Sequence, residues 1–283
     1  MTIADFKNKF KTELSELYTD SEIDFLYSVF IEKILDLNQI QQRILSNQEL
    51  SQDNKNQLEN IISELKTGKP YQHILGETEF YGMTFFVNEN VLIPRPETEE
   101  LLELAIHKIK NSQLNLKNLK ILDIGTGSGI IPLVLKKHFP NSEISSIDFS
   151  EKALEVAKRN ADFHQVEIKL IHADYLNFNL NENYDVIISN PPYIGIEEEV
   201  EIEDSVKGFE PTMALFSPTS DALIFYKKIA EDSGKYLNKN GLLFLEINQK
   251  LGQETLELYR NNFSKSELIK DLSENDRFIF GIK

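Results

Sequence analysis

The stretch that decides the fold of this 283-residue chain is Asp123-Ile124-Gly125-Thr126-Gly127-Ser128-Gly129. It ends an apolar run over 119–124, typical of a buried strand, and precedes a helical pattern over 130–139. Glycines at such a junction allow a tight turn and let a ligand approach the backbone closely. The dinucleotide-binding pattern G-x-G-x-x-G needs a third glycine at the position that Ile130 occupies here. The stretch therefore predicts a ligand-binding turn of another kind.

Strand and helix patterns alternate around this turn. Strands are expected over 143–148, 166–171, 184–189, 241–247, 266–270 and 277–282, and helices over 151–164, 222–237 and 255–262. Alternating units of this kind predict an α/β fold with a parallel, doubly wound sheet, whose ligands bind at the carboxyl ends of the strands. Asp148 ends the second strand, where a carboxylate accepts hydrogen bonds from both hydroxyls of a ribose.

The glycine stretch has the pattern D-x-G-x-G-x-G, which resembles the S-adenosylmethionine loop of class I methyltransferases. The resemblance implies that this loop and the second-strand acid hold the cofactor through Gly125, Thr126, Gly127, Ser128, Gly129 and Asp148. The acid does not discriminate by itself, because NAD-binding folds share it. The alternative is a glycine turn without a ligand, which the coincidence of strand, glycines, helix and acid disfavours.

The fourth strand runs into Asn190-Pro191-Pro192-Tyr193. Two consecutive prolines fix φ, remove both N–H donors and hold each preceding residue extended. The rigid loop presents two acceptors, the side-chain oxygen of Asn190 and the carbonyl of Pro191, which suit the two hydrogens of a planar NH₂ group. Tyr193 offers a flat face on which that group stacks. The loop therefore predicts methylation of a planar NH₂ by positioning and electrostatics, without choosing between a glutamine amide and the amines of adenine and cytosine.

The first part of the chain has the pattern of a small helical bundle. Apolar residues step by three and four along the first helix at Ile3, Phe6, Phe10, Leu14 and Leu17. Ser21 and Asp24 suggest a capping box for the second helix. Nothing here looks catalytic, so a partner-binding module and a stabilising appendage are equally good interpretations.

Residues 76–93 combine strand-forming residues with turn signals, which predicts a β-hairpin between two domains. We therefore divide the chain into three parts. These are a helical bundle over 1–70, which is the candidate partner-binding module, a hairpin hinge over 71–95, and an S-adenosylmethionine-dependent methyltransferase domain over 96–283. Pro132 lies early in the helix expected over 130–139, where proline is tolerated only within the first turn.

Composition limits the classes of function. The chain has 46 acidic and 30 basic residues, a formal net charge of −16, and shows no long basic run for phosphate contacts. The absence of cysteine excludes disulfides, thiolate metal sites and cysteine nucleophiles. The five histidines lack ligand spacing, which disfavours a metal hydrolase. We find no apolar run long enough for a membrane span and no signal peptide, and we expect a cytoplasmic protein.

Most of the chain resembles the PrmC/HemK family, the protein-(glutamine-N(5)) methyltransferases of peptide chain release factors. The similar stretches are Pro70-Tyr71-Gln72-His73-Ile74-Leu75-Gly76 with Glu79-Phe80-Tyr81-Gly82, Val91-Leu92-Ile93-Pro94-Arg95-Pro96-Glu97-Thr98-Glu99, Phe209-Glu210-Pro211 with Ala214-Leu215, Leu245-Glu246-Ile247, and Lys270-Asp271-Leu272 with Asp276-Arg277. Residues 1–70 are similar only in being a helical bundle.

The resemblance implies a class I S-adenosylmethionine-dependent methyltransferase fold, Rossmann-like, joined by the hairpin to the N-terminal bundle. It implies S-adenosylmethionine as donor and the glutamine of the Gly-Gly-Gln motif of class I release factors as substrate, giving N(5)-methylglutamine. Tyr175 would flank the adenine, and Asn190 would touch both cofactor and substrate. The glutamine amide would be gripped by Asn190, Pro191, Pro192 and Tyr193, of which Asn190, Pro191 and Tyr193 would be catalytic. Arg95 and Glu97 are assigned to the same cleft by resemblance alone.

Two other functions are alternatives. An adenine-N6 methyltransferase of DNA or RNA would need a basic target-recognition region, and a cluster of acidic residues just after the Asn190 loop would repel a phosphate backbone. The members of this acidic cluster are Glu197, Glu198, Glu199, Glu201, Glu203 and Asp204. The cluster either meets a basic surface of a release factor or is a solvated face. A non-catalytic S-adenosylmethionine-binding translation factor would be free to lose the Asn190 loop. We expect a monomer without direct nucleic-acid or membrane partners.

Overall fold

The computed structural model describes residues 1–193, 208–217 and 219–283, which form two compact units. The first unit comprises residues 1–77 with 208–209. The second comprises residues 78–193, 210–217 and 219–283. The acidic cluster that sequence analysis placed after the Asn190 loop lies outside the described residues.

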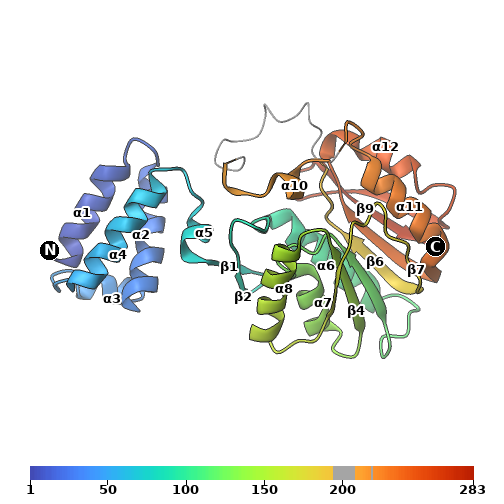
Figure 1. The fold of residues 1–283 in the computed structure, drawn as a ribbon, viewed down its shortest axis with the longest axis horizontal. Coiled ribbons are helices and arrows are strands. Elements are labelled where there is room, and N and C mark those ends of the chain that lie inside the picture. The colour runs from blue at the N-terminus through green and yellow to red at the C-terminus, as the bar shows by residue number, and fades with distance from the viewer. Residues whose placement is uncertain (194–207, 218) are drawn as a thin grey trace. The chain divides into compact units, whose positions relative to one another are not determined.

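The first unit is helical (Figure 1). Its helices are α1 (Ile3–Leu14), α2 (Asp20–Leu35), α3 (Gln39–Ile44), α4 (Gln52–Leu65) and α5 (Tyr71–Leu75). The predicted stripe of α1 is buried at its first four positions, but Leu17 is 56% exposed. The stripe fails there because α1 ends at Leu14 and the chain turns away from the helical path.

The N-terminus of α2 also differs from the prediction. The capping box is formed by Thr19 and Glu22, not by Ser21 and Asp24. The Glu22 carboxylate accepts a hydrogen bond of 2.7 Å from the Thr19 N–H, and the Thr19 hydroxyl accepts one from the Glu22 N–H. Both pairs have the required spacing, so the sequence pattern alone does not choose between them.

A short hairpin stands at the start of the second unit. Its strands are β1 (Glu77–Phe80) and β2 (Met83–Phe86), and both turn residues, Tyr81 and Gly82, have positive φ, at 52° and 66°. Two left-handed residues in a two-residue loop match the twist of paired strands. The buried Asn160 side chain bonds to both the N–H and the carbonyl of Phe86 and so fastens the hairpin to helix α8 (Glu151–Phe163).

The core of the second unit is a seven-stranded sheet in the order β5-β4-β3-β6-β7-β9-β8. Its strands are β3 (Lys120–Ile124), β4 (Glu143–Asp148), β5 (Lys169–His172), β6 (Tyr184–Ser189), β7 (Leu237–Glu246), β8 (Lys265–Lys270) and β9 (Asp276–Ile282). The first five in spatial order are parallel, and β9 and β8 are antiparallel to their neighbours. The predicted doubly wound α/β fold is therefore confirmed, with an antiparallel addition at one edge.

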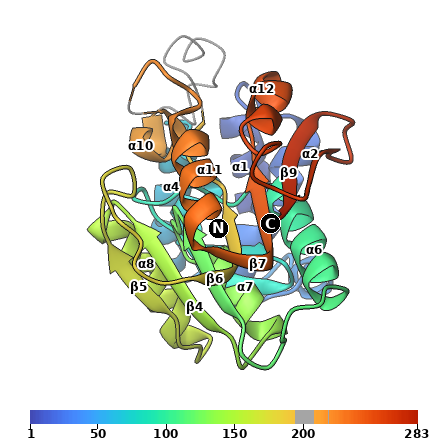
Figure 2. The same cartoon turned by 90° about the vertical axis from the view of Figure 1, so that its right-hand side faces the viewer.

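Helices cover both faces of this sheet. One layer contains α6 (Pro96–Lys110), α7 (Ile130–His138) and α8, and the other contains α11 (Ile224–Tyr236) and α12 (Gly252–Glu257) (Figure 1). Figure 2 looks onto α11, which packs on β7. Side chains of a strand point alternately to the two helical layers. On β6, Val186 and Ile188 pack with the layer of α6, α7 and α8, and Ile187 packs with the layer of α11 and α12. Burial on both faces explains why the strands read as continuous apolar runs.

Most element positions agree with the sequence prediction, with differences at the ends. Pro132 lies in the first turn of α7, whose N-cap is Gly129, so it displaces no helical hydrogen bond. Helix α12 ends at Glu257, short of the predicted 262. Successive bonds from Leu258 N–H to the Thr255 carbonyl and from Tyr259 N–H to the Leu256 carbonyl tighten the chain into turns there. No helix in the described part of the chain has the length and apolar character of a membrane span.

Candidate active site

The carboxyl ends of three neighbouring strands meet at one edge of the sheet. In the parallel register, Ile124 of β3 lies opposite Ile147 of β4 and Ser189 of β6. The Ser189 hydroxyl donates a hydrogen bond of 2.7 Å to the Ile124 carbonyl, and the Gly125 N–H donates one of 2.8 Å to the Ile147 carbonyl. The glycine loop, the second-strand acid and the Asn190 loop follow directly after these residues. They are therefore brought together, as ligand sites of such sheets require.

A cavity of about 550 Å³ opens at this edge, a volume typical of small-molecule sites. Its lining includes seven of the residues predicted to bind or act, namely Gly125, Gly127, Asp148, Tyr175, Asn190, Pro191 and Pro192. Four others lie outside the lining, namely Thr126, Ser128, Gly129 and Tyr193. Much of the remaining wall comes from the segment Asn90–Leu92, from the turn after β4, from residues 173–176 after β5, from residues between 211 and 217, and from Phe225 of α11.

Asp148 connects the glycine loop to the turn after β4. Its Oδ2 accepts a hydrogen bond of 2.8 Å from the Gly127 N–H, and its Oδ1 accepts one of 2.8 Å from the Ser150 N–H. Burial raises the pKa of Asp148, and the N–H groups of Ser150, Gly127 and Phe149 oppose that rise. Because each carboxylate oxygen has further lone pairs, Asp148 can hold the loop and still accept hydrogen bonds from the hydroxyl groups of a ligand in the cavity.

Gly129 gives a first testable prediction. Its φ is +83°, and a Cβ there would lie 3.1 Å from the Cβ of Ala157. We expect Gly129→Ala to lower the free energy of unfolding by about 1–3 kcal/mol through backbone strain and this contact. Urea denaturation measures the change. Gly82→Ala is the matched control, since Gly82 has φ +66° but no atom within 4 Å of its added Cβ. Equal losses in both variants would refute the role of the Ala157 contact.

Asp123, the first residue of the glycine stretch, is fully buried. Burial raises its pKa from 3.8 to about 7, and the negative charge of Asp148 adds to the rise. Between these two pH values the native carboxyl keeps a proton that the unfolded chain has lost. Stability therefore falls as pH rises through this window.

The neutral variant Asp123→Asn removes this dependence. We expect the free energy of unfolding of the variant, minus that of wild type, to increase by on the order of 3 kcal/mol between pH 4 and pH 8. Chemical denaturation of both proteins at several pH values measures the difference. A difference that is constant across this pH range would contradict the assignment.

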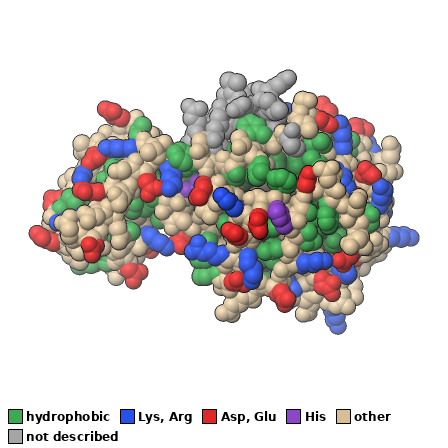
Figure 3. All heavy atoms as spheres, viewed as in Figure 1, with side chains coloured by type: hydrophobic (Ala, Val, Ile, Leu, Met, Phe, Trp, Pro, Cys, Tyr) green, Lys and Arg blue, Asp and Glu red, His purple; other side chains and the backbone are tan. Residues whose placement is uncertain are grey.

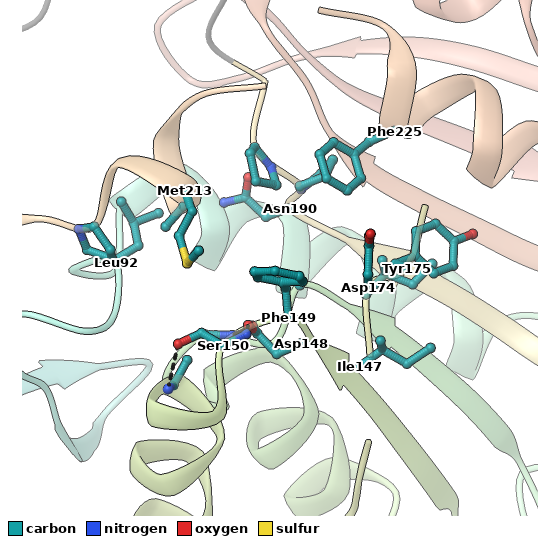
Figure 4. A pocket seen from close by; sticks show the side chains of 18 of the residues that line it. Leu92, Ile147, Asp148, Phe149, Ser150, Asp174, Tyr175, Asn190, Met213 and Phe225 are labelled. Atoms are coloured by element: carbon teal, nitrogen blue, oxygen red, sulfur yellow. Dashed lines mark hydrogen bonds between the residues drawn. The ribbon is translucent and has the colours of Figure 1, made fainter. Parts of the chain in front are cut away.

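Aromatic side chains form part of the cavity wall. Tyr175 is 5% exposed, and its hydroxyl donates a hydrogen bond of 2.9 Å to Asp232, which Lys228 also contacts. The ring is thereby fixed at the position predicted to flank a base. Phe149 also lines the cavity, where it lies among Asp148 and the other lining residues, and its side chain is 58% exposed (Figure 4). Sequence analysis did not predict this residue. A large apolar residue directly after a strand-end acid was the available signal.

The Asn190 loop presents Asn190, Pro191 and Pro192 to the cavity but turns Tyr193 away from it. The Tyr193 hydroxyl lies 3.5 Å from Oε1 of Glu246, and its carbonyl accepts a hydrogen bond of 3.2 Å from the Asn248 side chain. Burial and the Glu246 charge raise the pKa of Tyr193, so its hydroxyl stays protonated. Tyr193 is therefore not among the residues that line the cavity.

Arg95 and Glu97 lie outside the cavity lining. Arg95 instead forms an ion pair of 2.6 Å with Glu210, whose second oxygen accepts a hydrogen bond of 3.0 Å from the Ile93 N–H. Glu210 is buried and directly precedes the wall segment 211–217. The pair therefore fastens that wall to the segment before α6. Across the described residues, no group of three or more His, Asp or Glu side chains could hold a metal ion.

Comparison with known folds defines the class of protein. The chain is similar in fold to the structure titled "Crystal structure of Methyltransferase from Pyrococcus furiosus", with a TM-score of 0.51 at 16% identity, covering 82% of this chain and 99% of that one. Residues 103–206 match the family described as methyltransferase small domain, and residues 8–76 match the PrmC N-terminal domain. The fold is that of the class I S-adenosylmethionine-dependent methyltransferases, as predicted.

Relatives in sequence define the family. The chain is 43% identical over 282 residues to a release factor glutamine methyltransferase of Flavobacterium psychrophilum, covering 99% of this chain and 98% of that protein. It is 41% identical over 232 residues to a protein of the same name from Streptococcus pneumoniae, covering 81% and 80% of the two chains. The chain belongs to the release factor glutamine methyltransferase family, which confirms the predicted resemblance.

Proposed function

We propose that this protein transfers the methyl group of S-adenosylmethionine to the side-chain amide nitrogen of the glutamine in the Gly-Gly-Gln motif of class I peptide chain release factors. The observation that carries the proposal is the placement of Asn190, Pro191 and Pro192 in the same cavity as Asp148 and the glycine loop. A donor held by one wall and an amide held by the other then share a single enclosed space.

The residues present fit S-adenosylmethionine. The loop at Gly125 and Gly127 lets a ligand approach the backbone, and Asp148 retains acceptor capacity for ribose hydroxyls. Phe149 and Tyr175 provide apolar surface for an adenine ring. When bound, the cofactor supplies an electrophilic methyl group on a sulfonium. The cavity therefore offers a carboxylate to the ribose hydroxyls and flat apolar surfaces to the base.

The Asn190 loop suits a planar amide. An amide nitrogen is a poor nucleophile because its lone pair is delocalised into the carbonyl. Acceptors at Asn190 Oδ1 and the Pro191 carbonyl would hold the two N–H hydrogens, return electron density to nitrogen and aim its lone pair at the methyl group. On transfer the nitrogen would gain a bond to the methyl carbon, the electron pair of the broken carbon–sulfur bond would remain on sulfur, and the proton lost by the nitrogen would pass to water. Positioning of this kind supplies much of the rate of such transfers.

We further propose that the helical part over 1–70 binds the release factor, with residues 71–95 as a hinge and 96–283 as the catalytic domain. The match of residues 8–76 to the PrmC N-terminal domain supports a role specific to this family rather than a general stabilising one. Because release factors act on ribosomes, the protein would work in the cytoplasm, and we propose that it does so as a monomer.

Methylation of an adenine in nucleic acid is the nearest rival. The net charge of −16 disfavours it, since phosphate contacts need clustered Lys and Arg. On the face of the second unit drawn in Figure 3, basic side chains lie among acidic ones. A non-catalytic cofactor-binding role would leave the Asn190 loop without a function. We therefore propose no direct nucleic-acid partner.

Methyl transfer from labelled S-adenosylmethionine tests the proposal. Intact class I release factor, duplex DNA and total RNA are offered in parallel, and the Gly-Gly-Gln peptide is examined by mass spectrometry. We expect label on that glutamine and none in a release factor carrying Gln→Ala at the motif. Label on nucleic acid would mean that the substrate is nucleic acid and not the release factor. Cofactor binding without any methyl transfer would support the non-catalytic role.

A further inference from the structure

A chain of buried hydrogen bonds lies behind the Asn190 loop. The side-chain nitrogen Nδ2 of Asn190 lies 3.2 Å from the hydroxyl of Thr98, and that hydroxyl lies 2.7 Å from Oε2 of Glu246. Thr98 belongs to the first turn of α6 and Glu246 ends β7, so the three residues come from separate elements. Thr98 is 3% exposed and Glu246 is 1% exposed, which shields both bonds from water.

The order of donors in this chain follows from the number of hydrogens. An ionised carboxylate can only accept, so Thr98 must direct its single hydroxyl hydrogen to Glu246. Thr98 then offers Asn190 nothing but lone pairs. The Asn190 amide must therefore turn its NH₂ group toward Thr98. Its oxygen Oδ1 is left as the atom that can accept a hydrogen bond from a bound amide.

Among the residues that the structure describes, four other groups face Glu246. They are Tyr193 after β6, Arg277 on β9, Glu97 in the first turn of α6, and Tyr226 on α11. Burial raises the pKa of Glu246 from 4.5 to about 7, assisted by the negative charge of Glu97 and opposed by Thr98, Arg277 and Tyr193. Glu246 can therefore lose its proton near neutral pH. Once protonated, its carboxyl could donate to Thr98, and the fixed order of donors would be lost.

We propose that Thr98 and Glu246 are positioning residues that orient the side-chain amide of Asn190 so that Oδ1 faces the amide nitrogen to be methylated. The inference rests on the proposed function, because it assigns the machinery of that reaction. It treats Asn190 as the residue that touches substrate, and Thr98 and Glu246 as acting only through it. A flipped amide would present NH₂ to NH₂, a repulsive pairing.

Two substitutions of Thr98 separate this role from simple packing. Thr98→Val keeps the shape of the side chain and removes the hydroxyl, whereas Thr98→Ser keeps the hydroxyl and removes a methyl group. If Thr98 orients Asn190, we expect Val to lower kcat by about tenfold or more with little change in KM, and Ser to stay within about threefold of wild type. A packing role predicts the opposite ranking. Thr255→Val, at another fully buried threonine, is the control and should leave kcat unchanged.

The pH profile supplies a second readout. Wild type and Thr98→Ser are expected to lose kcat as pH falls through about 7, because protonated Glu246 no longer fixes the Thr98 hydroxyl. Glu246→Gln cannot titrate, so its kcat should be lower at pH 8 and lack this acid limb. An acid limb that persists unchanged in Glu246→Gln would overturn the role of Glu246.

A spectroscopic measurement distinguishes failure of this inference from failure of the proposed function. The side-chain NH₂ resonances of Asn190 are identified by their loss in Asn190→Ala. We expect them to shift in Thr98→Val and to stay near wild-type positions in Thr98→Ser and Thr255→Val. If these shifts occur but the release factor is not methylated, the orienting role of Thr98 stands and the proposed substrate is wrong. Unchanged resonances and unchanged kcat in Thr98→Val would overturn the inference.

Discussion

Replacing Asn190 with alanine is expected to lower kcat for methyl transfer to the release factor by about 10²–10³-fold, comparable to the loss of one preorganised hydrogen-bonding group in other active sites. The reason is geometric. Asn190 is the side chain of the loop that both lines the cavity and is held from behind, through Thr98. Its loss would leave the substrate amide with the Pro191 carbonyl as its acceptor. Single-turnover kinetics with saturating cofactor measures the chemical step.

Cofactor affinity is expected to fall much less than kcat in Asn190→Ala, because the glycine loop and Asp148 remain. Isothermal titration with S-adenosylmethionine measures it. Asn183→Ala is a matched control at the other end of β6, where Asn183 bonds to Asn238 at 3.3 Å and does not line the cavity. Full turnover in Asn190→Ala would remove the loop from the mechanism. Loss of binding in proportion to kcat would make Asn190 a cofactor ligand only.

Replacing Asp148 with asparagine is expected to weaken S-adenosylmethionine binding by about 10–100-fold. The carboxylate now accepts hydrogen bonds from the Gly127 and Ser150 N–H groups, and it lines the cavity. Asparagine keeps the shape but has one acceptor oxygen and an NH₂ that opposes a second N–H donor. Both the loop geometry and the acceptor for ribose hydroxyls are impaired. Titration calorimetry measures the dissociation constant.

The effect of Asp148→Asn is expected to disappear in large part when cofactor is saturating, because Asp148 is remote from the amide in this scheme. Asp162→Asn, at an exposed acid on α8 paired with Lys158, removes the same charge without touching the cavity. A similar loss of affinity in Asp162→Asn would point to net charge rather than to the Asp148 contacts. Unchanged affinity in Asp148→Asn would remove it from the cofactor site.

The local features of this protein were readable in its sequence. Glycines after an apolar run specify a tight turn, and two prolines after a strand specify a rigid loop, because both act through backbone dihedrals of the residues themselves. Alternating strand and helix patterns predicted the parallel sheet, and the rule that ligands bind at the strand ends pointed to the edge where the cavity lies. Helix ends were predicted less accurately: the capping box of α2 is formed by Thr19, and α12 ends earlier than predicted.

Contacts across long sequence distances were decided only by the tertiary structure. Asn190 and Thr98 are 92 positions apart, and Thr98 and Glu246 are 148 apart. No local pattern relates such residues, since their proximity depends on strand order and on how α6 packs against β7. The same holds for Tyr193, whose hydroxyl is directed to Glu246 rather than to the cavity. The sequence by itself thus determined the two loops and the α/β order of the elements that carry them, whereas packing of the sheet and its helices determined which side chains hold those loops in place.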